Sequence, residues 1–193
     1  EAEDSAWAVR GFTRFTGTVT ESLPHFYIAE YRTYFGYDKV LGTGPYNFGW
    51  ANSKPNWVER FKNHQGLLIW YVNYAYGDND VSQHPGYGLN LPVDVRPGPI
   101  TVPGQGNITN RRSSYDATFS KFTKPAQTFH LNGVPTTVPK LKPVTVFNDS
   151  QPDRYWSAQN PQNSVKVAGT GTKIELILEN RLITDLAIIK ITN

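Results

Sequence analysis

The segment Gly66–Asn73 (GLLIWYVN) constrains the fold more than any other part of the chain. Alternate residues of an extended strand point to opposite faces, and every residue from 67 to 72 is aliphatic or aromatic. Both faces of such a strand are therefore apolar. This pattern is typical of a strand that is buried on both sides, so the sequence predicts a buried strand here.

Several other segments have the composition of strands. They are rich in aromatic and β-branched residues, and turn residues separate them. The strongest are His25–Phe35, Lys173–Leu178 and Asp185–Thr192, and the weaker ones are Gly11–Thr20, Val144–Phe147 and Ser164–Val167. In Lys173–Leu178, we expect Ile174, Leu176 and Leu178 to share one face. We expect Asp185–Thr192 to be the antiparallel partner of that strand.

Helical periodicity is absent from the sequence. Apolar residues nowhere recur at i, i+3, i+4 and i+7 over three turns, and the best helical candidate, Asn56–Phe61, is long enough for a single turn only. Many short strands separated by turns indicate an all-β protein. The sequence predicts a β-sandwich of the jelly-roll kind, with two packed β-units as the alternative.

The length of the chain suits one large domain. Its 193 residues are enough to bury a substantial core. Residues 92–142 begin with a stretch rich in proline and glycine and show little clean alternation. We therefore expect a single domain over residues 1–193 with a long excursion at 92–142. The alternative is a split into two units, residues 1–105 and 140–193.

Composition excludes several classes of protein. Aromatic residues make up 13% of the chain, so disorder of the whole chain is excluded. The net charge of +3 is dispersed, whereas nucleic-acid proteins concentrate basic residues in a stripe. No apolar run reaches the ~20 residues that span a bilayer. The chain has no Cys, which a secreted protein with a large core tolerates. It has no Met either, so we expect an upstream segment to have been removed or the chain to be a fragment.

Catalytic motifs are missing. A zinc peptidase of the HExxH type needs two His four residues apart, with Glu after the first. No two of the four His are so spaced, and none is followed by Glu. The chain has no cysteine nucleophile and no GxSxG motif. We expect no zinc and no catalysis in this chain. Only a pair of distant carboxylates, as in glycosidases, stays open.

Three blocks of the sequence carry a family resemblance. The first is Phe26–Arg32 followed by Gly36-Tyr37-Asp38 and Leu41. The second and most specific runs from Gly66–Val72 through Asp78-Asn79 and His84-Pro85-Gly86 to Pro92-Val93-Asp94. The third comprises Asn110-Arg111-Arg112, Tyr115–Phe119, Phe147–Ser150, Tyr155-Trp156 and Gly169–Thr172.

These blocks resemble the β-rich VEG domain that follows the catalytic domain in immune inhibitor A-like metallopeptidases. The resemblance implies a secreted, non-catalytic accessory domain whose partner is the catalytic domain of the same precursor. The chain departs from the family at Asn73, where Asp is common after the Trp-Tyr-Val motif. That change removes a charge from any site the position serves.

A loop after the buried strand carries a candidate calcium site. The side-chain oxygens of Asp78, Asn79 and Asp80, with Asp94 downstream, are the ligand type that Ca²⁺ prefers. The same residues are equally natural turn formers, because Asx side chains accept hydrogen bonds from nearby backbone amides. We expect His84 to hydrogen-bond one of these aspartates and to hold the return of the loop.

Two other groups of side chains are candidates for binding or structural roles. Glu30 and Arg32 share a strand face, and we expect an ion pair there, with a ligand-contacting pair as the alternative. Aromatic residues in loop-like contexts could form a platform for sugars, or could plug the ends of a sandwich. The platform candidates are Trp50, Trp57, Tyr87, Tyr155 and Trp156.

Three functions follow from these observations. The first is an accessory module of a metallopeptidase. In such a module we expect Trp70, Glu30 and Arg32 to have structural roles. The second is a module that binds polysaccharide or a surface protein. The third is an independent enzyme with paired carboxylates. The sequons at Asn107 and Asn148 leave glycosylation open.

Overall fold

The computed structural model describes residues 23–34, 39, 63–100, 115–131, 134–181 and 186–193. Strands dominate these residues, and a short 3₁₀ turn, η3 (Pro152–Arg154), follows β6 (Val146–Asn148). The strands are β1 (His25–Arg32), β2 (Gly66–Asn73), β3 (Asn90–Val93), β4 (Gln127–Leu131), β5 (Val134–Val138), β6 (Val146–Asn148), β7 (Lys173–Asn180) and β8 (Leu186–Thr192). None of the described residues forms a helix with the length and hydrophobicity that crossing a membrane requires.

The first sheet has the order β1-β2-β3 and is antiparallel throughout. β2 lies in the centre, and Ile28 of β1 and Pro92 of β3 flank its Trp70. Pro92 is tolerated because β3 is an edge strand, where a missing N–H breaks no ladder. β2 begins at Gly66, whose φ is +153°. An added Cβ there would lie 2.6 Å from the carbonyl oxygen of Phe119, so only glycine permits this close approach.

The second sheet has the order β6-β7-β8 and is also antiparallel. A β-bulge interrupts the pairing of β7 with β8 between Leu176 and Leu178. Because one extra residue reverses the facing of every later side chain, Ile174 and Leu176 are buried whereas Leu178 is exposed. The prediction that all three share one face is therefore wrong at Leu178.

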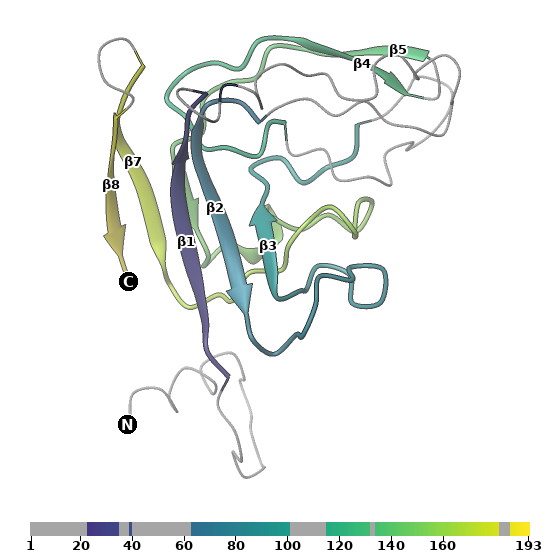
Figure 1. Ribbon diagram of the computed structural model, residues 1–193, viewed down its shortest axis with the longest axis vertical. Coiled ribbons are helices and arrows are strands. Elements are labelled where there is room, and N and C mark those ends of the chain that lie inside the picture. Colours follow the sequence, from purple (N-terminus) through teal and green to yellow (C-terminus); the bar gives the residue numbers. More distant parts are fainter. Residues whose placement is uncertain (1–22, 35–38, 40–62, 101–114, 132–133, 182–185) are drawn as a thin grey trace.

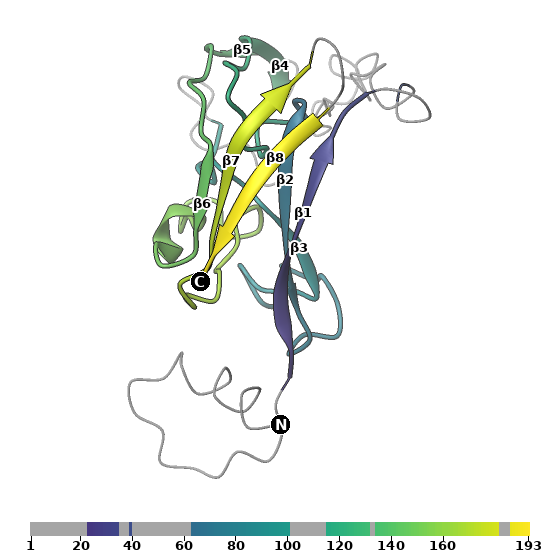
Figure 2. The ribbon, with the colours of Figure 1, turned by 90° about the vertical axis from the view of Figure 1, so that its left-hand side faces the viewer.

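The two three-stranded sheets share one hydrophobic core (Figures 1 and 2). Aromatic rings dominate its centre, where Phe147 lies 5.0 Å from Tyr155 and 4.8 Å from Tyr27 between ring centroids. The core cluster consists of Leu67, Ile69, Tyr71, Leu91, Val93, Val95, Phe119, Phe147, Tyr155, Val165, Val167 and Ile174. β4 and β5 form a separate hairpin at one end of the molecule (Figure 1).

The segment after residue 115 ties these parts together. Isolated bridges join Phe119 to Leu67 at the start of β2, Ser120 to Val144, and Lys124 to Leu141. Residues 115–124 thus connect the first sheet to the strand region that leads into β6.

The all-β class is confirmed, and so are β2 and the antiparallel pairing of β7 with β8. The jelly-roll sandwich and the limits of the domain stay predictions. Ser164–Val167 is not a strand: its amides bond to separate partners, Val165 N to Tyr155 O and Lys166 N to Gly86 O, instead of to one ladder. β3, β4 and β5 were not predicted. Gly11–Thr20 and Asn56–Phe61 lie outside the described residues.

Candidate functional site

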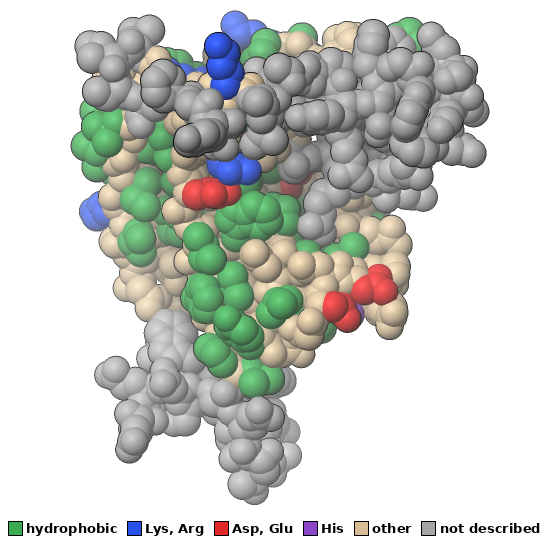
Figure 3. All heavy atoms as spheres, viewed as in Figure 1, with side chains coloured by type: hydrophobic (Ala, Val, Ile, Leu, Met, Phe, Trp, Pro, Cys, Tyr) green, Lys and Arg blue, Asp and Glu red, His purple; other side chains and the backbone are tan. Residues whose placement is uncertain are grey.

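The face of the first sheet opposite the shared core carries exposed apolar side chains along β1, whereas Leu68 and Val72 of β2 on the same face are buried and Trp70 is half-buried. The strand register places Phe26 and Ile28 of β1 on this face, beside Trp70 of β2. Phe26 and Ile28 are 42% and 45% exposed, and Tyr74, whose ring lies 6.2 Å from that of Phe26, is 52% exposed. Hydrophobic side chains gather over this sheet in the space-filling view (Figure 3). We call Phe26, Ile28, Trp70 and Tyr74 the apolar stripe.

A small polar group borders the apolar stripe. Arg32 Nε lies 3.5 Å from Glu30 Oε1, and both side chains are about one-third exposed. Trp70 Nε1 donates a 2.8 Å hydrogen bond to the same Glu30 oxygen. A bond between neighbouring strands thereby fixes the position of the indole N–H. A half-exposed ion pair contributes little free energy by itself, so the geometry orients Trp70 more than it stabilises the fold.

The loop between β2 and β3 uses its carboxylates to shape its own backbone. Asp78 Oδ1 accepts from Asp80 N at 2.7 Å, and Asp80 Oδ1 accepts from Ser82 N at 3.1 Å. Asn79 Oδ1 accepts from Asn90 N at 2.8 Å, which fixes the loop to the start of β3. The bonds accepted by Asp78 and Asp80 are Asx-turn bonds, the structural alternative to calcium binding.

His84 links the two ends of this loop. Its Nδ1 lies 2.7 Å from Tyr87 O, and its Nε2 lies 2.8 Å from Asp78 Oδ1. A carbonyl and a carboxylate only accept hydrogen bonds, so the ring satisfies both when both nitrogens are protonated. The hydrogen bond to Tyr87 O, and then that to Asp78, accordingly raise the pKa of His84. The expected bond between His84 and an aspartate is present.

The four predicted calcium ligands do not lie together. The loop joins one pair of ends of β2 and β3, whereas Asp94 follows the opposite end of β3 (Figure 1). Asp94 is buried, and its Oδ1 accepts from Arg96 N at 2.6 Å. Across the described part of the chain, no three His, Cys, Asp or Glu side chains are grouped so as to hold a metal ion. Calcium binding by the loop stays an untested prediction.

Two of the predicted platform residues meet at the surface. Lys166 Nζ lies 4.3 Å from the ring centroid of Trp156 and 5.0 Å from that of Tyr87. Tyr87 in turn stacks on Tyr76, with centroids 5.3 Å apart. Gly86, at φ +86°, lets the backbone pass against the Trp156 ring, which a Cβ would overlap. The cation covers ring faces that a flat sugar would use.

The other platform candidates do not join this group. Tyr155 is a correction: it is completely buried in the core, and its hydroxyl oxygen accepts from Asn148 N at 2.9 Å. A ring with no exposed surface cannot stack on a sugar. Trp50 and Trp57 lie outside the described residues, as does the sequon at Asn107. Asn148 is half-buried at the end of β6.

Sequence reasoning missed a buried cluster of charges. Asp94, Asp116 and Lys124 are each at least nine-tenths buried, and Arg96 lies beside them. Burial raises the pKa of Asp116 to about 6 and lowers that of Lys124 to about 8. Burial and then the charge of Asp116 raise the pKa of Asp94. No spacing in the sequence signals this cluster, because its members are brought together by tertiary contacts alone.

The buried cluster predicts an unusual dependence of stability on pH. The pKa of Asp116 is raised above its ordinary 3.8, so the folded state binds the proton more tightly. This contribution to stability is present below about pH 3.8 and is lost as the pH rises through about 6. We expect the free energy of unfolding of Asp116→Asn, relative to that of the wild type, to rise by about 2 kcal/mol from pH 4 to pH 7. Urea unfolding measures this difference. A difference that is flat across this range would contradict the raised pKa.

Comparison with known proteins places the chain in a family. The VEG domain of immune inhibitor A-like metallopeptidases matches residues 20–183. Pre-pro-metalloprotease PrtV of Vibrio cholerae is 30% identical over 179 residues, which is 92% of this chain and 18% of that protein. Immune inhibitor A of Bacillus thuringiensis is 31% identical over 175 residues, 86% of this chain and 22% of that protein. The chain thus spans about a fifth of the length of these curated relatives. The chain therefore belongs to the VEG-domain family of the immune inhibitor A-like metallopeptidases.

Proposed function

We propose that this chain is a secreted, non-catalytic accessory domain that docks through its apolar stripe on the catalytic domain of a metallopeptidase precursor. The observation that carries the proposal is the exposure of Phe26, Ile28 and Tyr74 around Trp70 on one sheet face. Contiguous exposed apolar surface marks a site of protein interaction. Aromatic side chains of this kind are enriched among the residues that contribute most to binding.

The relatives support the choice of the catalytic domain as the proposed partner. One is named as a pre-pro-metalloprotease and the other as immune inhibitor A. About four-fifths of each lies outside the region that this chain matches. A partner within the same polypeptide is held at a high effective concentration by its linkage. A modest apolar stripe is then enough for stable docking, whereas a separate protein would need a larger surface.

The charges beside the apolar stripe fix the orientation of a partner that docks there. Glu30 and Arg32 lie beside Trp70 and form the polar border that interfaces place around an apolar centre. Charges at such a border contribute more to the choice of partner and its orientation than to affinity. The role we propose is positional: the domain supports the catalytic domain and the approach of its substrate.

A pair of matched isoleucine substitutions tests the docking site. Ile28→Glu lies in the apolar stripe, whereas Ile188→Glu lies on β8 of the other sheet, and the two side chains are 45% and 49% exposed. We expect Ile28→Glu to weaken binding of this domain to the separately produced catalytic domain at least about tenfold, because a charge would be buried without a partner. The measurement is a dissociation constant from calorimetry.

The control separates docking from general damage. Ile188→Glu should leave the dissociation constant within about twofold of the wild type. Equal weakening by both variants, or no complex between the wild-type domains and no change in peptidase activity, would contradict the proposal.

A further inference from the structure

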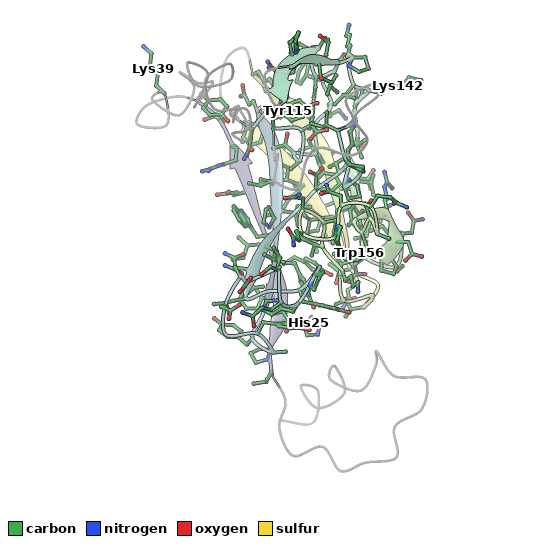
Figure 4. All side chains as sticks on the ribbon, turned by 90° about the vertical axis from the view of Figure 1, so that its right-hand side faces the viewer. His25, Lys39, Tyr115, Lys142 and Trp156 are labelled. Carbon is green, nitrogen blue, oxygen red and sulfur yellow. The ribbon has the colours of Figure 1, made fainter. Side chains whose placement is uncertain are left out.

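A pocket of about 400 Å³ opens at the end of the molecule that carries the β4–β5 hairpin. It lies between residues 96–100, the pair Tyr115-Asp116, and β5 with the loop that follows it. Figure 4 shows Tyr115 and Lys142 toward this end, far from His25. The pocket is separate from the apolar stripe and is not used by the function proposed above. Its volume falls in the range of small-molecule sites, roughly 300–1,000 Å³.

Most of the pocket wall is apolar. The segment after Arg96 contributes Pro99 and Ile100, and the chain from β5 onward contributes Val138, Pro139 and Leu141. Proline-rich walls change little in shape when a ligand enters, because the ring fixes φ. A wall of this kind accepts a branched aliphatic group but supplies no hydrogen bonds, so specificity rests on the few polar side chains that also line the pocket.

Asp116 provides a carboxylate that accepts a hydrogen bond from its own backbone amide and is attracted by the charges of Lys124 and Arg96. The residue lines the pocket and is only 8% exposed. The ammonium of the neighbouring Lys124 donates to Thr118 O and Thr118 Oγ1 and to the backbone oxygen of Asp116, not to its carboxylate. Among the described residues, no side chain donates a hydrogen bond or forms an ion pair to this carboxylate.

Thr136 supplies an unfilled group on the same pocket. It is 8% exposed, and its hydroxyl oxygen, although buried, has no hydrogen-bond partner within the part of the chain that the structure describes. A buried hydroxyl without a partner costs about 1–3 kcal/mol. A ligand that supplies a donor to Asp116 and Thr136 would remove that cost.

Arg96 adds the opposite charge. Its Nη atoms donate to the backbone oxygens of Asp116 and Lys142, the first at a long 3.5 Å. For the residues described, no carboxylate pairs with this guanidinium, and its Nε has no acceptor. An arginine can donate five hydrogen bonds and binds carboxylates in a planar, two-point manner. One pocket therefore presents a carboxylate without a side-chain hydrogen-bond donor and a guanidinium without a paired carboxylate, and the nearby Lys124 and Arg96 charges offset only part of the rise in the pKa of Asp116.

We propose that this pocket binds a free α-amino acid with an apolar side chain. Its ammonium group lies at Asp116 and Thr136, its carboxylate at Arg96, and its side chain against the Pro99, Ile100 and Leu141 wall. Each charged group of the ligand then meets a side chain of the opposite charge. No covalent step is involved.

Three related ligands test the two charged contacts separately. L-leucine has both charges, L-leucinamide lacks the carboxylate and N-acetyl-L-leucine lacks the ammonium. We expect L-leucine to bind the 193-residue chain saturably in the millimolar range or tighter, and each derivative to bind at least about tenfold more weakly. Binding is followed by NMR chemical shifts of residues around the pocket.

Two substitutions assign the contacts to residues. Asp116→Asn, which keeps the shape of the side chain, should weaken L-leucine and L-leucinamide about tenfold and leave N-acetyl-L-leucine unchanged. Arg96→Gln should weaken L-leucine and N-acetyl-L-leucine instead. Asp153→Asn, on the exposed η3 turn, is the matched control and should change nothing. If Asp116→Asn did not fold, Thr136→Val would replace it, with a weakening of a few-fold for L-leucine.

Two outcomes would overturn the proposal. The first is no saturable shift with millimolar L-leucine. The second is equal weakening of all three ligands by Asp116→Asn, which would indicate a change in the pocket as a whole. A dipeptide, Leu-Leu, that bound more tightly than L-leucine, with the same dependence on both residues, would identify a peptide as the natural source of the two charges and would overturn the assignment to a free amino acid.

Discussion

Replacing Asp149 with alanine is expected to destabilise the domain by about 3–5 kcal/mol. The residue is completely buried directly after β6, and its carboxylate accepts four hydrogen bonds. Gly171 N donates to Oδ1 at 2.7 Å, whereas Oδ2 receives Thr170 N at 3.0 Å, Thr170 Oγ1 at 2.6 Å and Tyr27 OH at 3.1 Å. Alanine would leave these part-buried donors without their acceptor.

The position of Asp149 explains why local repair cannot compensate. The Tyr27 hydroxyl belongs to β1 of the first sheet, whereas Thr170 and Gly171 form the turn that leads into β7 of the second. One carboxylate therefore joins the two sheets at the edge of their shared core. Because Tyr27 also accepts from Ala168 N at 3.1 Å, loss of the carboxylate loosens a further segment.

Urea unfolding monitored by tryptophan fluorescence measures this effect. A loss of 3–5 kcal/mol corresponds to a fall in Tm of about 10 °C or more for a domain of this size. Asp153→Ala, an exposed aspartate in η3, is the matched control and should change the free energy of unfolding by less than about 0.5 kcal/mol. Similar losses for Asp149→Ala and Asp153→Ala would show that the buried carboxylate is not needed for stability.

Replacing Glu179 with alanine is expected to cost about 3–5 kcal/mol as well, for a different reason. Glu179 and Arg181 form an ion pair, with Arg181 Nε 2.8 Å from Glu179 Oε1, the Glu179 side chain fully enclosed and the Arg181 side chain a quarter exposed. The other oxygen, Oε2, accepts from Ser120 Oγ at 2.9 Å and Lys121 N at 2.7 Å. Removal of the carboxylate leaves the Arg181 charge without its ion-pair partner. It also leaves these donors without an acceptor.

The same strand supplies a matched control. Glu175 of β7 pairs with Lys173 at 3.5 Å, but both side chains are about two-fifths exposed. Glu175→Ala should therefore cost at most about 1 kcal/mol. Glu179→Gln should fall between the two, because the amide oxygen still accepts but the charge on Arg181 loses its partner. Equal effects of Glu179→Ala and Glu175→Ala on urea unfolding would contradict the claim that burial makes the loss of the Glu179 carboxylate costly.

The sequence predicted the strands that local pattern controls. Gly66–Asn73 has an unbroken apolar run, and in the structure it is the central strand of its sheet with both faces largely buried. β7 and β8 were predicted as an antiparallel pair because Lys173–Leu178 alternates and a second apolar segment follows after a short polar interval. In these segments the pattern of side chains and the surroundings agree, so propensity and tertiary structure give the same answer.

The predictions failed where the surroundings override the pattern. Leu178 alternates with Leu176 in sequence, but the β-bulge turns it outward. Polar and apolar residues alternate in Ser164–Val167 as in a strand, yet its amides do not hydrogen-bond to one neighbouring segment. Tyr155 lies in a polar stretch typical of a loop, yet it is completely buried in the core. Each outcome depends on a contact with a residue distant in the chain, which no local window contains.

The sequence by itself determined the all-β class, the central strand and the family to which the chain belongs, because alternation and motif order are properties of neighbouring residues. Only the tertiary structure decided which polar groups are buried. Asp149, Glu179 and Asp116 resemble surface carboxylates in the sequence, but folding encloses each of them. The first two meet hydrogen-bond donors from other segments, whereas Asp116 faces a pocket. The cost of burying a charge depends on the partners that the fold supplies, and those partners are set by the packing of the sheets.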